Sequence, residues 1–488
     1  MTIPDEQAAT AALLERLAGS PPIETHISLV FAGADTVWKL RKAGRKPYLD
    51  FTSSDERHRA ALRELELNAP HAPGMYRDVV PVTRASDGSV ALGGDGEMID
   101  WVVRMSRVPE ADFLDAIAAR GALTPALLDA LGDAVAAYHD ALPPVTKDQV
   151  ALMRRIVFGN RMSALAAGMD ATEVERWTEA VITALERLGA WLGAREAAGY
   201  VRRAHGDLHL ANLCLWQGRP VPFDALEFNE DLATIDVAYD FAFLVMDLEM
   251  LASRAAANHV LNRYVARTGD WGLVAGLPLF QSMRAMISAH IAASRGRPEL
   301  SRRYLDQAFG YLTPAPTAVV AIGGLMGSGK STLARALAPE LGPAPGALVL
   351  RSDEVRKRLF GRAPEAKLPQ SSYTTGASRE VFAAMLRAIA GSAAAGHGVI
   401  ADATFMDLSL RDRARRAAGS TRFLGVWLQA PLAVLEQRVT ARRGDASDAD
   451  LGVLRRAAAH DPGPRDWLPV EAIDADAALA KVCVALGC

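Results

Sequence analysis

The sequence predicts a multidomain chain in which a mixed α+β domain precedes a doubly wound, parallel α/β domain. A chain of 488 residues is longer than one hydrophobic core usually supports, so two or three domains are expected. Two prolines in the segment 312–317 (LTPAPT) mark a linker, because neither a helix nor a central strand accommodates them. After this segment, strand-like and helix-like patterns alternate, which is typical of a parallel sheet covered on both faces. We therefore place the two domains at 1–312 and 317–488.

The composition points to globular domains in a reducing compartment. Half of the residues are hydrophobic and the formal net charge is -3. The chain therefore lacks the basic surface that nucleic acid or an anionic membrane attracts. The three cysteines, Cys214, Cys483 and Cys488, are too few and too scattered for a disulfide framework. Residues 1–17 lack the features of a signal peptide, and no apolar run reaches the roughly 18 residues that cross a bilayer. We expect a cytoplasmic protein, and the sequence leaves its oligomeric state open.

The first domain divides into a strand-rich part and a helical part. The segments 25–31, 36–41 and 98–103 are rich enough in β-branched and aromatic residues for strands. Ser53 and Glu56 form a capping-box pattern that begins a helix. From Thr124 onward the pattern is mostly helical as far as Tyr311, except over 201–229. We expect an N-lobe at about 24–105 and a C-lobe at about 106–312.

The second domain alternates regularly. Strands are predicted at 318–322, 347–351, 399–402 and 422–428, and helices at 330–341, 355–360, 380–395 and 431–443.

The segment 205–212 (HGDLHLAN), followed by Asp224, has a spacing that suits phosphoryl transfer. Asp207 can accept the proton of an attacking hydroxyl. Asn212, at the end of the same loop, can reach a Mg²⁺ ion, and a strand–turn–strand over 213–223 would return the carboxylate of Asp224 to that ion. Phosphoryl transfer needs a base and metal charge on the phosphates more than covalent chemistry from the protein. Asp207 is therefore the predicted base, and Asn212 and Asp224 are the predicted magnesium ligands.

This HGDxHxxN segment and the following Phe223-Asp224 pair resemble the aminoglycoside phosphotransferase and choline kinase group. The resemblance covers about 24–312 and implies a bilobal protein-kinase-like fold with ATP between the lobes. The segment 31–35 (FAGAD) has one glycine and no GxGxxG loop, so the cover over the phosphates must differ from that of protein kinases.

In that implied fold the strand carrying Val37, Trp38 and Lys39 would supply the lysine that binds the ATP phosphates. Lys39 shares a strand face with Val37, whereas Lys42 points to the opposite face and is the second choice. We predict Glu66 as the helix partner of Lys39, in preference to Glu64, because Glu66 lies nearer the face of Leu62 and Leu65.

Several further polar residues of the first domain have more than one interpretation. Glu227 and Asn229 could contact the metal or the acceptor, or could cap the next turn. Arg284 could bind an acceptor or form a surface salt bridge. For the remaining candidates a structural role is favoured over a chemical one, and these are Asp236, Asp240, His139 and His209.

The segment 324–331 (GLMGSGKS) follows a buried strand and begins a helix, which is the setting of a complete Walker A loop. Backbone N–H groups of such a loop and the helix N-terminus hold phosphates. We predict that Lys330 bridges the β- and γ-phosphates of ATP and that Ser331 ligates Mg²⁺. The other predicted nucleotide-binding residues of this loop are Gly324, Gly327, Ser328, Gly329 and Thr332.

The strands that neighbour this loop end in polar residues. Strand 347–351 is followed by Asp353 and Arg356, at the sheet edge where an acceptor would lie. Strand 399–402 ends in Asp402, a predicted metal ligand in the position of a Walker B carboxylate. The basic segment 438–445, with Arg442, is a candidate lid that supplies charge to the transferring phosphoryl group.

Residues 317–488 resemble small P-loop kinases: gluconate kinase, chloramphenicol phosphotransferase, the zeta-toxin group and the kinase domain of polynucleotide kinase. The resemblance implies that Asp353 is the acceptor base and that Arg356 binds the acceptor. A helix N-cap with a surface arginine is the alternative interpretation of this Asp-x-x-Arg pattern.

Together the two motifs predict an ATP- and Mg²⁺-dependent phosphotransferase with two centres. The first would phosphorylate a hydroxyl of a small molecule such as a sugar, an aminoglycoside or an amino alcohol, and the second would be a P-loop small-molecule kinase. One alternative is a nucleic-acid end kinase, which the near-neutral charge disfavours. Another is a regulatory protein in which one ATP site gates the other domain, which the carboxylates in both halves disfavour. The sequence identifies neither acceptor.

Overall fold

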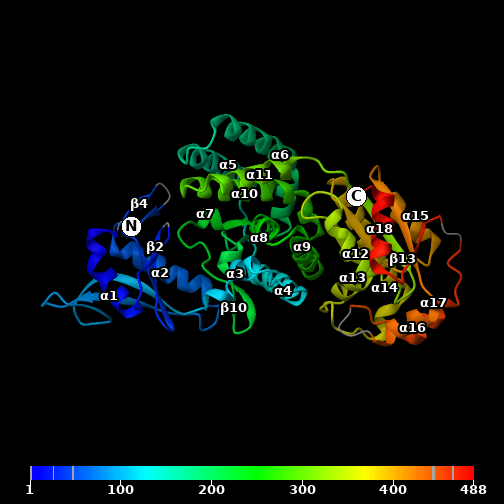
Figure 1. The fold of residues 1–488 in the computed structure, drawn as a ribbon, viewed down its shortest axis with the longest axis horizontal. Coiled ribbons are helices and arrows are strands. Elements are labelled where there is room, and N and C mark those ends of the chain that lie inside the picture. The colour runs from blue at the N-terminus through cyan, green and yellow to red at the C-terminus, as the bar shows by residue number, and fades with distance from the viewer. Residues whose placement is uncertain (1–2, 26, 47–48, 442–445, 464–465, 488) are drawn as a thin grey trace. The chain divides into compact units, whose positions relative to one another are not determined.

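The structure is a computed structural model that describes residues 3–25, 27–46, 49–441, 446–463 and 466–487 (Figure 1). The chain forms two compact units. One comprises Met1–Leu123, Ala137–Leu152 and Leu192–Leu244, and the other comprises Thr124–Ala136, Met153–Trp191 and Val245–Cys488. Across the described ranges, no helix combines the length and the apolar character needed to cross a membrane.

Most of the elements in the first unit surround one antiparallel sheet. Its helices and 3-10 turns are η1 (Asp5–Gln7), α1 (Ala8–Ala18), α2 (Ser54–Asn68), η2 (Glu110–Asp112), α3 (Leu114–Ala119), η3 (Leu210–Asn212) and α7 (Glu230–Ala233), with α4 (Pro125–Ala141) and α8 (Val237–Leu251) belonging to it in part. Its strands are β1 (Ile23–Glu24), β2 (Ser28–Ala32), β3 (Thr36–Arg41), β4 (Arg45–Lys46), β5 (Leu49–Asp50), β6 (Tyr76–Arg84), β7 (Val90–Leu92), β8 (Glu97–Ser106), β9 (Val201–Arg203), β10 (Leu213–Trp216), β11 (Arg219–Pro222) and β12 (Thr234–Asp236).

The six-stranded sheet has the order β1-β2-β3-β8-β6-β7 and covers a core on each face. On one face, Leu14 of α1 packs with Leu29, Phe31 and Leu40. On the other, Ala61 of α2 belongs to a core that includes side chains of the β10–β11 hairpin. Helix α2 begins as predicted, since the hydroxyl of Ser53 accepts a hydrogen bond from the Glu56 N–H at 3.2 Å. Strand β3 thus lies between the core that includes α1 and the β10–β11 hairpin, which leads to Asp224.

The second unit contains helices on both sides of the proline-marked segment. Its helices and 3-10 turns are α5 (Gln149–Ala166), α6 (Ala171–Ala197), α9 (Arg254–Thr268), η4 (Trp271–Ala275), α10 (Leu277–Ser294), α11 (Pro298–Leu312), α12 (Lys330–Leu337), η5 (Ala338–Glu340), α13 (Ser352–Leu359), η6 (Gln370–Tyr373), α14 (Thr375–Ala394), α15 (Leu408–Ala417), α16 (Leu432–Ala441), α17 (Leu451–Ala458) and α18 (Ala475–Leu486). Its strands are β13 (Ala318–Gly324), β14 (Leu348–Arg351), β15 (Val399–Asp402), β16 (Arg422–Gln429) and β17 (Leu468–Glu471).

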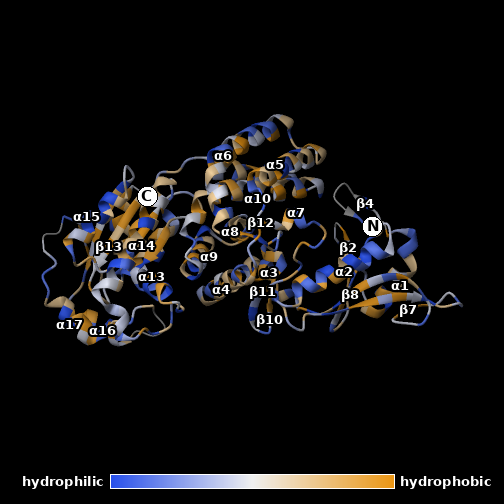
Figure 2. Ribbon diagram, turned by 180° about the vertical axis from the view of Figure 1, so that it is seen from behind, coloured by the Kyte–Doolittle hydropathy of each residue, from blue (hydrophilic) through white to orange (hydrophobic). Residues whose placement is uncertain are grey.

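These five strands form a parallel sheet with the order β14-β15-β13-β16-β17, which confirms the predicted doubly wound α/β fold. Successive residues of β13 alternate between two cores: Val320 and Ile322 pack with α12 and α18, whereas Val319 and Ala321 pack with α14 and α15. Figure 2 shows the apolar character of these central strands. Parallel strands buried on both faces are apolar throughout. Because these strands are parallel, the carboxyl ends of β13, β14 and β15 meet at one edge of the sheet.

Helix α9 lies against the edge strand of this sheet. The side-chain oxygen of Asn262 accepts the Val349 N–H of β14 at 2.6 Å, and the amide of Asn258 donates to the Ala347 carbonyl at 3.0 Å. An edge strand presents unpaired N–H and C=O groups, and the two asparagines satisfy part of that row. Helix α11 ends at Leu312 and β13 begins at Ala318.

Tight packing against Trp467 generates a stability prediction. A Cβ added to Gly425 of β16 would lie 2.4 Å from ring atoms of Trp467. Gly425→Ala should therefore overpack the core and lower the free energy of unfolding by about 1–3 kcal/mol, measured in the full chain by denaturant titration. Gly310→Ala on α11, where an added Cβ meets nothing within 4 Å, is the matched control and should cause no loss. Equal midpoints for the two variants would contradict this packing.

Candidate active sites

The loop that carries Asp207 is held in place by a carboxylate of helix α8. The carboxylate of Asp240 accepts the backbone N–H groups of His205 at 3.0 Å and Gly206 at 2.9 Å. Gly206 has a φ of 84°, and an added Cβ would lie 3.1 Å from Leu226, so glycine suits this position. The ring Nε2 of His205 donates to the carbonyl of Phe223 at 2.9 Å. These bonds fix the loop to the segment that carries Asp224.

Asp207 and Asn212 lie together, as the spacing predicts. The amide nitrogen of Asn212 donates to the carbonyl of Asp207 at 2.9 Å and to its carboxylate at 3.1 Å. The side chain of Asp207 is 41% exposed, and Nε2 of His209 lies 3.4 Å from its Oδ2. His209 thus buttresses the loop, and the Asp207 carboxylate stays accessible to an acceptor.

Asp224 has an uncommon backbone conformation with a φ of 59°. Aspartate tolerates the left-handed region better than most residues. The conformation is held by side chains of the first unit, because the Asp224 N–H donates to the Tyr76 hydroxyl at 3.0 Å and the Ala225 N–H to the Asn68 side chain at 2.9 Å. The carboxylate of Asp224 forms an ion pair with Lys39.

The predicted helix partner of Lys39 is wrong. Nζ of Lys39 pairs with Oε1 of Glu64 at 2.7 Å, whereas Glu66 is 68% exposed and pairs with Arg63 on its own helix. The buried side of α2 includes Ala60, Glu64 and Asn68, which recur every four residues and so share one face. Two positions along the helix from Glu64, Glu66 falls outside this face.

The choice of Lys39 over its neighbour agrees with the structure. Lys39 is buried. Lys42 instead forms an exposed hydrogen bond to Glu24 at 3.0 Å.

Sequence reasoning missed a second buried cation beside Lys39. Arg41 lies two residues further along β3, on the same strand face, and is 2% exposed. Its guanidinium pairs with Glu64 and lies 2.5 Å from Oε1 of Glu227. Glu64 is thus shared by two cations, and Glu227 joins the arrangement from the segment after Asp224. The alternation of Lys39 and Arg41 is the signal that could have revealed this.

The charges around Lys39 shift several pKa values. Burial alone would lower the pKa of Lys39, but the carboxylates of Asp224 and Glu64 outweigh it and raise that pKa. Burial raises the pKa of Asp224, but Lys39 and Arg41 outweigh it and hold the pKa below its usual range. Burial raises the pKa of Glu227 to about 7 in spite of Arg41. Lys39 and Asp224 are therefore both charged at neutral pH.

Other candidates of the first motif have structural roles. The ring of His139 lies 3.2 Å from the Asp240 carboxylate, so it is a core histidine. Asp236 forms a buried ion pair with Arg195 at 2.6 Å. The side chain of Asn229 caps α7 by accepting the Leu232 N–H at 3.0 Å. Arg284 is buried rather than at the surface.

The Walker A loop leaves the end of β13 in a conformation that requires glycine. Gly324, Gly327 and Gly329 have φ values of 137°, 81° and 86°. An added Cβ at Gly324 would lie 2.4 Å from the Leu428 carbonyl, and one at Gly327 would lie 2.8 Å from the Leu435 carbonyl. Since backbone strain and close contacts would arise for other residues at these positions, glycine is required for the path of the loop.

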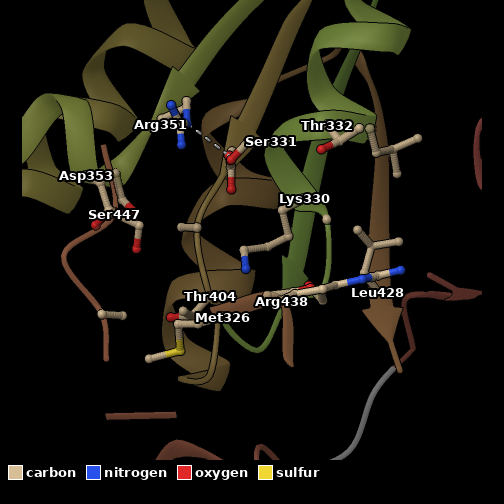
Figure 3. A pocket seen from close by; sticks show the side chains of 18 of the residues that line it. Met326, Lys330, Ser331, Thr332, Arg351, Asp353, Thr404, Leu428, Arg438 and Ser447 are labelled. Atoms are coloured by element: carbon tan, nitrogen blue, oxygen red, sulfur yellow. Dashed lines mark hydrogen bonds and ion pairs between the residues drawn. The ribbon is translucent and has the colours of Figure 1, made fainter. Parts of the chain in front are cut away.

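Polar side chains from three strand ends meet beside this loop (Figure 3). The hydroxyl of Ser331 donates to the carboxylate of Asp402 at 2.5 Å, and Arg351 Nε lies 3.5 Å from the same oxygen. Nζ of Lys330 donates to the Leu325 carbonyl at 2.9 Å. Ser331 and Asp402, each predicted as a magnesium ligand, therefore lie in direct contact.

The loop opens on a cavity of about 1200 Å³ that also contains the predicted acceptor residues. Asp353 lies in the first turn of α13, whose N-cap is Arg351, so Asp353 is not the N-cap that the alternative interpretation requires. Burial and the nearby Asp402 carboxylate raise the pKa of Asp353. Arg356 is 8% exposed, donates to the Ser372 carbonyl at 3.0 Å and lies over the ring of Tyr373.

Two other candidates for nucleotide binding have different outcomes. Thr332 lines the cavity beside the loop. Arg442 lies outside the described residues. Helix α16 presents Arg438, which lines the same cavity and donates to the Ala472 carbonyl at 2.7 Å.

Both sites offer groups that fit Mg²⁺ and a nucleotide. Magnesium prefers oxygen ligands, usually one or two carboxylates together with phosphates and water. The hydroxyl of Ser331 with Asp402, and the side chains of Asn212 with Asp224, are such sets. The buried hydroxyl of Ser328, in the middle of the Walker A loop, has no hydrogen-bond partner within the described part of the chain, which suits a loop that holds phosphate oxygens. Lys39 pairs with Asp224, and Lys330 lines the same cavity as Ser331 and Asp402.

Two family models match separate parts of the chain. Residues 27–277 match the model of the phosphotransferase enzyme family, and residues 319–462 match the model of an AAA domain family. The chain belongs to the phosphotransferase enzyme family, and the structure is a protein-kinase-like fold followed by a P-loop domain with a parallel sheet.

Among curated proteins, the chain is 29% identical over 466 residues to uncharacterized proteins of Mycobacterium tuberculosis and Mycobacterium bovis, covering 91% of this chain and 90% of each relative. Similar solved structures include a choline kinase from Cryptosporidium parvum Iowa II, with 9% identity, 59% of this chain and 87% of that chain covered, and a TM-score of 0.39. A gluconokinase from Sinorhizobium meliloti 1021 has 20% identity, covers 35% of this chain and 92% of that chain, and has a TM-score of 0.27.

The buried ion pairs of Glu64 predict a loss of stability when its carboxylate is removed, and Glu66 provides the control. Glu64→Gln removes the carboxylate shared by Lys39 and Arg41, so two buried cations lose their common partner. Removing one member of a buried ion pair typically costs about 3–5 kcal/mol of stability, which denaturant titration of the full chain would measure. Glu66→Gln, two residues away on the exposed side, should leave the midpoint unchanged. A larger loss for Glu66→Gln would restore the original assignment.

Proposed function

We propose that the protein is an ATP-dependent phosphotransferase with two phosphoryl-transfer centres. The first phosphorylates a hydroxyl of a small molecule such as a sugar, an aminoglycoside or an amino alcohol, and the second is a P-loop small-molecule kinase. One observation supports this above the others: each centre combines a lysine with oxygen ligands and a separate carboxylate, which is exposed in the first centre and lines the cavity in the second. The lysines are Lys39 and Lys330, and the carboxylates are Asp207 and Asp353.

In the first centre, Asp207 accepts the proton of the attacking hydroxyl. Its carboxylate is exposed to an acceptor and held by the amide of Asn212. Asn212 and Asp224 would hold Mg²⁺, which supplies positive charge to the phosphates when bound. Lys39 would exchange its contact with Asp224 for the phosphate oxygens, while Glu64 keeps its ammonium group in place. Arg41, paired with Glu64 and Glu227, fixes that carboxylate in turn.

In the second centre, Asp353 is the general base. Burial and Asp402 raise its pKa, and a base whose pKa lies nearer the working pH transfers protons more effectively. Lys330 and the glycine-rich loop hold the phosphates, and Ser331 with Asp402 would hold Mg²⁺. Arg356 contributes positive charge to the acceptor side of the cavity.

The first test concerns Asp207. In a full chain whose P-loop centre is silenced by Lys330→Ala, Asp207→Asn should abolish ATP-dependent phosphorylation of the first centre's acceptor and leave Mg-ATP binding intact. A library of sugars, amino alcohols and aminoglycosides, followed by mass spectrometry for one added phosphoryl group, identifies that acceptor. Near wild-type phosphorylation by Asp207→Asn would rule out the role assigned to this carboxylate.

The second test concerns Asp353. With the first centre silenced by Asp207→Asn, Asp353→Asn should lower phosphoryl transfer by about 10²–10⁴-fold, because general-base catalysis contributes that much. Affinity for Mg-ATP should change little, since Lys330 and Ser331 hold the phosphates. Asparagine keeps the size and shape of aspartate but cannot accept the proton as a carboxylate does, so unchanged turnover would show that Asp353 is only structural.

A further inference from the structure

Asp448, outside all the motifs discussed above, joins three separate segments of the P-loop domain. Its carboxylate lies 3.2 Å from Nζ of Lys357 in α13, accepts the Leu368 N–H at 3.0 Å and accepts the Tyr373 hydroxyl at 2.6 Å. These donors come from α13, from the loop after it and from η6. The Asp448 side chain therefore links the segment 446–450 to these three segments, which also line the cavity.

Breaking these contacts is unfavourable mainly because it leaves the buried ammonium group of Lys357 without its carboxylate partner. Its side chain is 1% exposed and is paired with Asp448. A buried ammonium group without a counter-charge is costly, so Lys357 favours the arrangement in which Asp448 stays in place. Burial would raise the pKa of Asp448, but the hydrogen bonds from Tyr373, Leu368 and Lys357 hold it below its usual range.

The residue before Asp448 contacts the proposed base. The hydroxyl of Ser447 hydrogen-bonds the carboxylate of Asp353, and Figure 3 shows the two side chains next to each other. Ser447 and Asp448 are neighbours in the chain, so anchoring one fixes the other. The same anchor reaches the acceptor side, because Tyr373 also lies under the guanidinium of Arg356.

We propose that Asp448 is a positioning residue for the P-loop centre, acting through Ser447. By fixing the segment 446–450 to Lys357, Leu368 and Tyr373, it holds the Ser447 hydroxyl on Asp353 and so orients the carboxylate toward the acceptor. This inference rests on the proposed function of the P-loop centre.

The test uses the full chain with Asp207→Asn, Mg-ATP as substrate and water as the acceptor, so no acceptor has to be known. Asp448→Ala and Ser447→Ala should each lower the Lys330-dependent ATP hydrolysis rate about tenfold with an unchanged KM for ATP. The double variant should lower it no further, since the two residues act as one unit. Tyr373→Phe should give a smaller loss of the same kind.

The matched control is Asp450→Asn, two residues along the same segment. Asp450 caps α17 through the Val453 N–H, and asparagine serves as well, so the rate should not change. Multiplied losses of about a hundredfold in the double variant, or an unchanged rate in Asp448→Ala, would overturn the proposal.

Hydrogen exchange separates failure of this inference from failure of the proposed function. Exchange at the Leu368 amide should speed up in Asp448→Ala and stay unchanged in Asp450→Asn. Slow exchange retained at Leu368 in Asp448→Ala would contradict the anchoring alone. Absence of any Lys330-dependent turnover in the otherwise unmodified P-loop centre would contradict the proposed function, and with it the role given to Asp448.

Discussion

The first centre depends on the two ion pairs that the carboxylate of Glu64 forms. It lies between the ammonium of Lys39 and the guanidinium of Arg41, with all three groups buried. Because an unpaired buried charge is far more costly than a paired one, the position of helix α2 is tied to strand β3. Lys39 in turn reaches Asp224, and Arg41 reaches Glu227. One shared carboxylate therefore connects the sheet, the helix and the segment that carries the predicted metal ligand.

The P-loop centre reaches a comparable arrangement of charges by different means. Backbone N–H groups and the start of a helix take the place of a buried ion-pair network, and the glycines keep that backbone in shape. Its charged side chains stand at the ends of adjacent parallel strands, where Asp402 and Ser331 meet at 2.5 Å. Lys39 lies on β3, Lys330 and Ser331 on α12, Asp402 on β15 and Asn212 in η3, whereas Asp224 lies in the segment after β11. The acceptor sides differ, because Asp353 is backed by a segment that must be held in place by Asp448.

The sequence predicts well where chemistry and spacing are local. The Walker A loop, the loop at 205–212 and the parallel character of the second sheet follow from patterns within a few tens of residues. The choice between Glu64 and Glu66 failed because it depends on which face of α2 meets β3, and exposed Leu62 misleads about that face. The contact of Arg41 with Glu227 and that of Asp448 with Lys357 join distant positions, and no short pattern encodes them. The sequence favours a structural role for Asp240, but its two hydrogen bonds to the loop at 205–212 are visible only in the structure.

The structure places two nucleotide-site candidates with separate chemistry on one chain. Calorimetric titration of the full chain with a non-hydrolysable Mg-ATP analogue would count them. Two analogue molecules should bind per chain, falling to one in Lys330→Ala. A single site in the unmodified chain, or loss of both sites in Lys330→Ala, would contradict it.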